Sequence, residues 1–295
     1  MKNVLLIINP KSGKLKNKSM LFDIINAINE EGYLVTTRIT QAIGDAERFA
    51  REGALSGTYD IIVCSGGDGT LRETVAGVFC AGGPVPIGYI PSGSTNDYAR
   101  SIGIPTDIRE AAKLAVLGKE HFVDVGFTGD TYFNYIASFG AFTSTSYNTS
   151  QSLKNMLGHT AYVLEGIKDL ANIKAVKARF ESDGNVYEGE YIFGAITNST
   201  SIGGIVKIDD DLVEFNDGLF EVCLMKKPKT PIELTKIVKG AMNSDFSDDV
   251  YDFFKTGKLK IDMEKAIDWS IDGEKYSGKE KMEITVNKNA VKIKS

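Results

Sequence analysis

A glycine-rich loop holds the residues best suited to chemistry in this chain. It reads Ser65, Gly66, Gly67, Asp68, Gly69, Thr70, and it joins an apolar run to a helical pattern. Glycines let a backbone turn sharply and approach a ligand closely, and the free N–H groups at a helix N-terminus attract anions such as phosphate. An aspartate in such a place is expected where a magnesium ion lies between its carboxylate and the phosphates. The same loop, taken alone, is equally typical of a plain tight turn.

Two further loops end strand-like runs in the same way. One reads Asn9, Pro10, Lys11, Ser12, Gly13, and the other reads Pro91, Ser92, Gly93, Ser94, Thr95, Asn96, Asp97. Ligands of open α/β sheets bind at the carboxyl ends of the strands, so three such loops predict one phosphate-binding edge. Asn96 and Asp97 also suit the cap of a following helix. Neither GxxxxGK[ST] nor GxGxxG occurs, so a P-loop enzyme and a standard dinucleotide-binding fold are not indicated.

These loops require strands and helices that alternate along the chain. Apolar runs bounded by turn residues predict buried strands, and apolar residues at helical spacing predict the helices between them. The expected order is strand 4–8, helix 19–31, strand 33–39, helix 45–52, strand 59–64, helix 71–79 and strand 85–90. This order predicts an α/β N-terminal domain with a parallel, doubly wound sheet.

The pattern changes near Val123, where short β-type runs replace the alternation. These runs cover 132–137, 175–180, 191–197, 218–225 and 258–263, and one helix is expected at about 158–170. We interpret this half as a second, mainly antiparallel β domain. A chain of 295 residues suits two domains. We expect the first to cover 1–123, with about 280–295 returning to it, and the second to cover 124–279.

Composition narrows the class of protein further. The net charge of −5 disfavours general nucleic-acid binding. No apolar run has the length of a signal peptide or a membrane span, which predicts a cytoplasmic protein. The cysteines and histidines have no neighbours at metal-ligand spacing, and we interpret them as structural: Cys64, Cys80, Cys223, His121 and His159.

The three loops together resemble the signatures of the diacylglycerol kinase catalytic-domain family, which includes soluble bacterial lipid kinases, sphingosine kinases and ceramide kinases. The resemblance extends over nearly the whole chain through Gly93 to Arg100, Gly158 to Leu170, Ile202-Gly203-Gly204, Asp217-Gly218-Leu219 and Asp272-Gly273-Glu274. It implies a two-domain fold like that of NAD kinase and diacylglycerol kinase. It also implies transfer of phosphate from ATP to a lipid hydroxyl, with ATP and magnesium in the interdomain cleft.

The resemblance also implies roles for individual residues. ATP would be contacted by residues of the three loops and two others: Asn9, Ser12, Gly13, Thr40, Gly66, Gly67, Asp68, Gly69, Thr70, Glu73, Ser94 and Asn96. Asp68, Asp97 and Asp124 would surround the catalytic magnesium. Asp217 would bind a second, structural metal, together with the main-chain carbonyls of Glu214 and Leu219.

Two of these assigned roles can also be interpreted from the residues alone, without the family resemblance. Asp124 lies in a strand-like run, where an isolated carboxylate is costly unless it is paired or bound to a metal. The resemblance makes Asp272 and Glu274 the candidates for the base that acts on the substrate hydroxyl, while Asp272-Gly273-Glu274 equally suits a hairpin turn. The sequence does not decide between the two carboxylates.

The chain departs from the family pattern at three places. Arg72 stands where asparagine is usual, and Ser94 replaces a threonine but keeps the hydroxyl. The segment Lys207 to Asp211 replaces a more apolar one that contains proline. We expect its acidic triplet to form an exposed loop rather than an extra metal contact.

The predicted function is ATP-dependent phosphorylation of diacylglycerol or a related lipid. One alternative is an NAD kinase, which shares the Gly67 to Thr70 loop, although Gly93 to Tyr98 resembles the lipid-kinase form. The other is a lipid- or nucleotide-binding regulator without catalysis, which the full set of aspartates disfavours. A lipid acceptor implies transient, peripheral contact with a membrane surface. No nucleic-acid partner is expected, and the resemblance is compatible with a homodimer.

Overall fold

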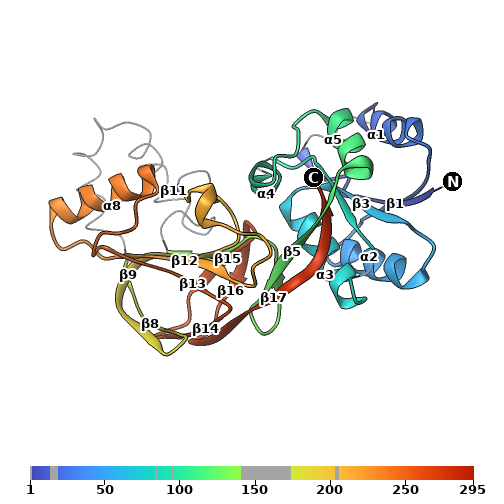
Figure 1. Cartoon of the computed structure of the whole chain (residues 1–295). Coiled ribbons are helices and arrows are strands. Elements are labelled where there is room, and N and C mark those ends of the chain that lie inside the picture. The colour runs from blue at the N-terminus through green and yellow to red at the C-terminus, as the bar shows by residue number, and fades with distance from the viewer. Residues whose placement is uncertain (1, 14–18, 84, 95, 141–173, 203–205) are drawn as a thin grey trace. The chain divides into compact units, whose positions relative to one another are not determined.

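The computed structural model describes residues 2–13, 19–83, 85–94, 96–140, 174–202 and 206–295. The chain forms two compact units, of which the first comprises Met1–Val125 and Lys288–Ser295 and the second Gly126–Asn287. Figure 1 shows a helix-rich unit and a strand-rich unit. The helix expected at 158–170 lies outside the described residues.

The first unit is built on four parallel strands in the order β4-β3-β1-β2. These strands are β1 (Lys2–Ile8), β2 (Tyr33–Ile39), β3 (Ile61–Gly66) and β4 (Ile87–Pro91). The main helices between them are α1 (Ser19–Glu30), α2 (Asp45–Ser56), α3 (Asp68–Cys80) and α5 (Ile108–Leu117), and the short α4 covers Asp97–Ser101. Helices α1 and α5 pack together on one side of the sheet and α2 and α3 on the other (Figure 1). The predicted doubly wound α/β sheet is confirmed.

The strand order places a switch point at the centre of this sheet. From β1 the chain passes to β2 on one side, and then crosses to β3 on the other side. Helices that leave on opposite faces open a crevice at the carboxyl ends of the two central strands. The loops that follow β1 and β3 are the Asn9 and Asp68 loops, so both border this crevice.

The last strand links the two units. Strand β17 (Lys281–Lys294) is antiparallel to β14 (Lys258–Met263) in the second unit, and its end, at Ile293 and Lys294, pairs in parallel with β4 in the first. The chain leaves the first unit in β5 (Glu120–Phe127). The observed boundaries therefore fall at Val125 and Lys288, beside the expected values of 123 and 280.

The second unit is mainly antiparallel, as expected. Its longer strands are β7 (Ile136–Gly140), β8 (Val176–Ser182), β9 (Asn185–Thr197), β12 (Phe220–Lys226), β13 (Tyr251–Thr256), β14, β15 (Asp268–Ile271) and β16 (Glu274–Ser277). Short strands cover Tyr132–Phe133 (β6), Ser201–Ile202 (β10) and Val206–Lys207 (β11). Aromatic side chains fill its core: the ring of Phe139 lies 4.9 Å from Trp269 and 6.2 Å from Phe180, centre to centre.

The structure has a helix in this half that the sequence analysis did not predict, α8 at Pro231–Asn243. The local signal was present. Thr230 caps the helix by accepting the N–H of Glu233, and Pro231 takes the first helical position, which suits proline. No helix among the described residues has both the length and the apolar character that crossing a membrane requires.

Candidate functional site

The three loops of the first unit are bonded to one another. The Asn9 side-chain amide donates to Thr70 Oγ1 at 3.0 Å, and the Asn9 backbone N–H donates to the Ser65 carbonyl at 2.9 Å. The Ser92 N–H donates to the Gly66 carbonyl at 2.8 Å. The structure thus brings the predicted residues of all three loops to one edge of the sheet.

Two glycines allow the second and third loops to touch. A Cβ atom added to Gly93 would lie 2.6 Å from the Cα of Gly67 and 2.8 Å from Oδ1 of Asn96. The Asn96 carboxamide accepts the Gly93 N–H and donates to the Gly93 carbonyl, both at 2.9 Å. Asn96 occupies the N-cap position of α4 with a φ of 52°. Its side chain bonds within the third loop and does not cap the helix.

The Gly93→Ala variant tests whether this close approach matters. We expect its Kd for ATP, the ligand expected of these loops, to rise at least about tenfold, because the added methyl group must push the Gly67 backbone away. Isothermal titration of the purified variant measures this. Gly189→Ala is the matched control, since its Cβ would meet nothing closer than 3.7 Å. An unchanged Kd for Gly93→Ala would show that the contact is not needed.

Two aspartates meet at the same edge. Asp68 begins α3 and Asp97 begins α4, and both are buried, with 9% and 8% of their surface exposed. Oδ2 of Asp68 accepts the Asp97 N–H at 3.1 Å, and the exposed Arg100 lies 3.5 Å from the Asp97 carboxylate. Burial and the charge of Asp68 raise the pKa of the nearby Tyr89 phenol, so Tyr89 stays neutral. The sequence analysis had overlooked this tyrosine.

Hard carboxylate oxygens of this kind suit magnesium. The described part of the chain contains no cluster of three or more histidine, cysteine, aspartate or glutamate side chains that could hold a metal by itself. Magnesium commonly binds through one or two carboxylates together with substrate phosphates. The pair Asp68 and Asp97 fits that mode.

Asp124 has a structural partner. It lies in β5 with 1% of its surface exposed, and its Oδ1 accepts the Asn289 N–H at 2.7 Å. Asn289 has a φ of 51°, in the left-handed region. Asp124 thus anchors the returning strand β17, and its place around magnesium stays a prediction.

Thr40 and Glu73 lie next to the loops. The Thr40 N–H donates to the Ile8 carbonyl at 2.9 Å, which places Thr40 beside the end of β1. Oε1 of Glu73 accepts the Gly44 N–H at 2.9 Å, and Oε2 accepts the Ala46 N–H at 3.1 Å. Glu73 therefore joins α3 to the start of α2, and its contact with ATP stays a prediction.

We expect Glu73→Ala to lower the free energy of unfolding by about 1–3 kcal/mol, because two N–H groups at the start of α2 lose a charged acceptor. Urea denaturation followed by circular dichroism measures this. The control is Glu47→Ala, which removes an exposed carboxylate from α2 and should change the free energy of unfolding by less than about 0.5 kcal/mol. Equal stability of the two variants would contradict the bridging role.

In the second unit, the hairpin-turn interpretation of residues 272–274 is confirmed. Strands β15 and β16 are joined by Asp272 and Gly273, which have φ values of 47° and 83°. Two residues with positive φ are typical of the type I′ turn. Both candidate bases therefore lie in or beside one tight turn.

The two candidate bases have different surroundings. Asp272 is 2% exposed, and its carboxylate accepts the backbone N–H groups of Asn134, Tyr135 and Ile136 at 2.7, 3.1 and 3.1 Å. A carboxylate has about four acceptor sites, so three of them are already used to hold the turn. Glu274 begins β16 and is exposed.

The predicted structural-metal residues lie before β12. Oδ1 of Asp217 accepts the Leu219 N–H at 2.8 Å, while Glu214 is exposed. A neighbouring carboxylate that the sequence analysis had missed, Glu221, is fully buried in β12, and burial raises its pKa to about 7. The acidic triplet Asp209 to Asp211 is exposed, as expected.

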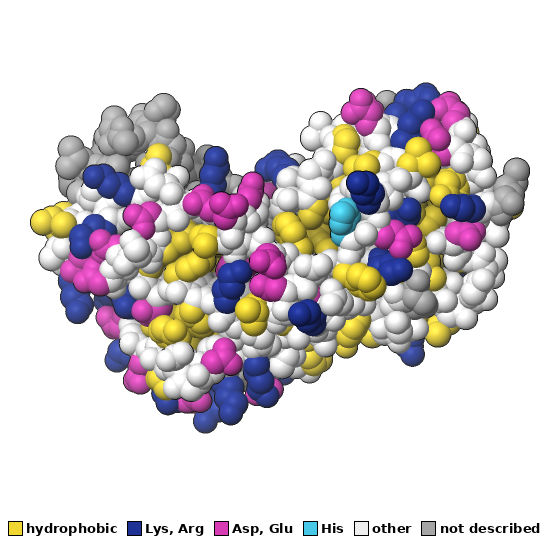
Figure 2. Space-filling view, viewed as in Figure 1, with side chains coloured by type: hydrophobic (Ala, Val, Ile, Leu, Met, Phe, Trp, Pro, Cys, Tyr) yellow, Lys and Arg dark blue, Asp and Glu magenta, His cyan; other side chains and the backbone are white. Residues whose placement is uncertain are grey.

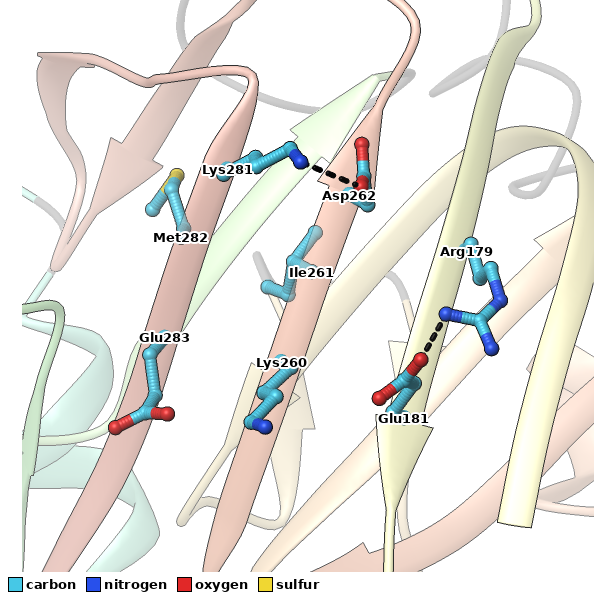
Figure 3. Close-up of a pocket in the computed structure, with 8 residues that line it drawn as sticks. All are labelled: Arg179, Glu181, Lys260, Ile261, Asp262, Lys281, Met282 and Glu283. Atoms are coloured by element: carbon cyan, nitrogen blue, oxygen red, sulfur yellow. Dashed lines mark hydrogen bonds and ion pairs between the residues drawn. The ribbon is translucent and has the colours of Figure 1, made fainter. Parts of the chain in front are cut away.

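A hollow of 370 Å³ lies on β8, β14 and β17 of the second unit (Figure 3). Its polar lining includes two ion pairs, Lys281 with Asp262 at 3.5 Å and Arg179 with Glu181. None of the predicted site residues lines it, and the strand alternation makes it the solvent face of the sheet. In Figure 2, positive and negative side chains are interspersed on the visible face, as the moderate net charge suggests.

Sequence comparisons match both halves of the chain. The pattern of the diacylglycerol kinase catalytic domain matches residues 3–128, and that of the YegS C-terminal NAD kinase beta sandwich-like domain matches residues 137–294. A diacylglycerol kinase of Bacillus subtilis (strain 168) is 33% identical over 280 residues, which cover 94% of this chain and 91% of the relative. A diacylglycerol kinase of Staphylococcus aureus (strain bovine RF122 / ET3-1) is 33% identical over 279 residues, or 94% of this chain and 87% of the relative.

Solved structures agree with this result. A provisionally assigned diacylglycerol kinase from Bacillus anthracis strain Sterne superposes with a TM-score of 0.80 at 26% identity, and the match covers 99% of this chain and 96% of the other. A second crystal structure of such a protein from the same strain gives a TM-score of 0.79, also at 26% identity, over 99% of this chain and 94% of the other. The predicted two-domain fold is thus confirmed.

Proposed function

The chain belongs to the diacylglycerol kinase family, and from this premise we propose that it transfers the terminal phosphate of ATP to a hydroxyl group of diacylglycerol or a related lipid. One observation of the structure carries the proposal: three phosphate-type loops meet at one edge of the parallel sheet, and the second and third of them bring Asp68 and Asp97 together there. With a lipid acceptor, the protein would associate transiently and peripherally with a membrane surface.

ATP binding rests on the backbone of the first unit. The N–H groups at the start of α3 and the positive end of that helix favour the phosphates. The bond from Asn9 to Thr70 and the Asn96 link within the third loop hold the loops in place before ATP arrives. Such preorganisation matters because phosphoryl transfer depends mainly on positioning and on charge stabilisation.

Asp68 and Asp97 would hold the magnesium ion that accompanies ATP. When bound, the ion would neutralise negative charge on the phosphates. The two side chains are buried beside the anion-binding loops, where their own charge would otherwise oppose phosphate binding. The hydrogen bond from the Asp97 N–H to Oδ2 orients the Asp68 carboxylate and so supports this role.

Between the two candidate bases, we propose Glu274. Asp272 already accepts three backbone N–H groups, and its carboxylate is almost fully enclosed. Glu274 is exposed and sits directly after the turn that Asp272 holds. Asp272 would then be a positioning residue, and Glu274 would take the proton of the attacking hydroxyl.

A transfer assay tests the proposal. The purified protein is incubated with magnesium and ATP labelled in the γ-phosphate, in micelles of diacylglycerol, of phosphatidylglycerol or of total lipid extract. We expect label in a lipid product and none when the lipid is left out. A protein that labels NAD and no lipid would instead be an NAD kinase. Binding of ATP without transfer to any acceptor would favour the regulator.

A further inference from the structure

Three charged side chains of the second unit meet where β12 begins. Glu221 in β12 lies directly opposite Lys255 in β13, and the Lys255 ammonium is 3.3 Å from Glu221 Oε1. The same ammonium is 3.5 Å from Oδ2 of Asp217. The side chains of Lys255, Asp217 and Glu221 are 32%, 19% and 0% exposed, so most of this group is shielded from water.

Lys255 is the only cation within ion-pair distance of these two carboxylates among the described residues. A fully buried carboxylate is costly without a partner of opposite charge. An ammonium group has three N–H donors and no acceptor, so a single lysine can serve two carboxylates at once. The Lys255 ammonium is thus within ion-pair distance of Asp217 in the turn and of Glu221 in β12, while neither oxygen of the buried Glu221 accepts a hydrogen bond from the described residues.

The surroundings of Asp217 do not fit the structural metal that the family resemblance implies. A divalent cation at this carboxylate would lie within a few ångströms of the Lys255 ammonium, and like charges in a shielded site repel strongly. Oδ1 of Asp217 accepts the Leu219 N–H at 2.8 Å, and Oδ2 faces the lysine. Both carboxylate oxygens therefore have positively polarised partners within the protein itself.

We propose that Lys255 is the built-in cation of this turn and that the chain holds no structural metal at Asp217. The ammonium ties the turn at Asp217 to strands β12 and β13. The loop before β12 would then be ordered in the absence of divalent ions. This inference is independent of the lipid-kinase proposal, because it concerns stability and metal binding and not turnover.

The proposed absence of a metal at Asp217 is tested directly with manganese, a paramagnetic substitute for magnesium. Wild-type protein and Asp217→Asn are dialysed against Mn²⁺ without nucleotide, and bound ion is counted by electron paramagnetic resonance. We expect the same number of bound ions in both proteins. A site present in the wild type and absent from Asp217→Asn would overturn the proposal, and this measurement needs no lysine variant.

The proposed stabilising role of the Lys255 ammonium is tested by measuring the melting temperature in EDTA. Lys255→Met removes the ammonium but keeps most of the apolar stem, and we expect Tm to fall by about 5–10 °C. Lys258→Met is the matched control, since Lys258 pairs with Glu283 at 2.9 Å on an exposed face, and its Tm should stay within about 1 °C of the wild type. A Lys255→Met protein that melts like the control would also overturn the proposal. Should Lys255→Met fail to fold, Lys255→Arg should restore a folded protein because it restores the charge.

Discussion

Asp68→Ala is expected to lose at least about two orders of magnitude in kcat, because removal of one group that organises charge in the transition state commonly costs that much. Asp68 lies at the start of α3, where the phosphates are proposed to bind, and it accepts the N–H of Asp97. Its carboxylate is nearly enclosed, so no neighbouring water can replace it easily. The measurement is the initial rate of lipid phosphorylation at saturating ATP and magnesium.

Two further variants serve as controls for this result. Asp68→Asn keeps the size of the side chain and an oxygen for the Asp97 N–H, so it should fold like the wild type and still lose most activity. Glu47→Ala removes an exposed carboxylate from α2 of the same unit, and its kcat should be unchanged. Turnover of Asp68→Ala within about threefold of the wild type would refute the assignment of the nucleotide site.

Glu274→Gln and Asp272→Asn are expected to fail for different reasons. Glu274 is exposed at the start of β16, so Glu274→Gln should lower kcat about 100-fold with an unchanged Tm. Asp272 holds three N–H groups that precede or begin β7. Asp272→Asn should therefore lower the free energy of unfolding by about 3 kcal/mol, because an amide has one oxygen where the carboxylate has two.

The contrast between activity and stability decides the roles. Kinetics and urea denaturation are measured on both variants and on Asp268→Asn, whose exposed carboxylate pairs with Lys275 at 2.7 Å and should contribute little. If Asp272→Asn keeps full stability but loses turnover, while Glu274→Gln is active, then Asp272 is the base. The proposed assignment would be reversed by that outcome.

Several features of this protein were determined by the sequence alone. The parallel sheet of the first unit follows from local patterns: continuous apolar runs such as Val4 to Ile8 can only be buried on both faces, and helical spacing between them requires crossover connections. The three loops were also predictable, since glycine and polar residues after each run leave little choice but a turn. Placing them at one edge needed only the rule that parallel strands end on the same side.

The sequence could not reveal the partners of the charged side chains. Glu73 bonds to residues 27 and 29 positions away, and Asp272 bonds to backbone groups 136–138 positions away. The pairing of Lys255 with Glu221 exists only because β12 and β13 are in one particular register. A carboxylate looks the same in the sequence whether it will hold a metal, a lysine or a backbone N–H.

Local order was therefore determined by the sequence, and the function of each charge was decided by the tertiary structure. Turns, strands and helix caps depend on interactions between near neighbours, which leave a pattern of residue types. α8 shows the limit of reading that pattern, because its cap at Thr230 and Pro231 was present and was overlooked. Electrostatic partners depend on distance in space, and chain folding alone brings Asp68 to Asp97, Asp124 to Asn289 and Asp217 to Lys255.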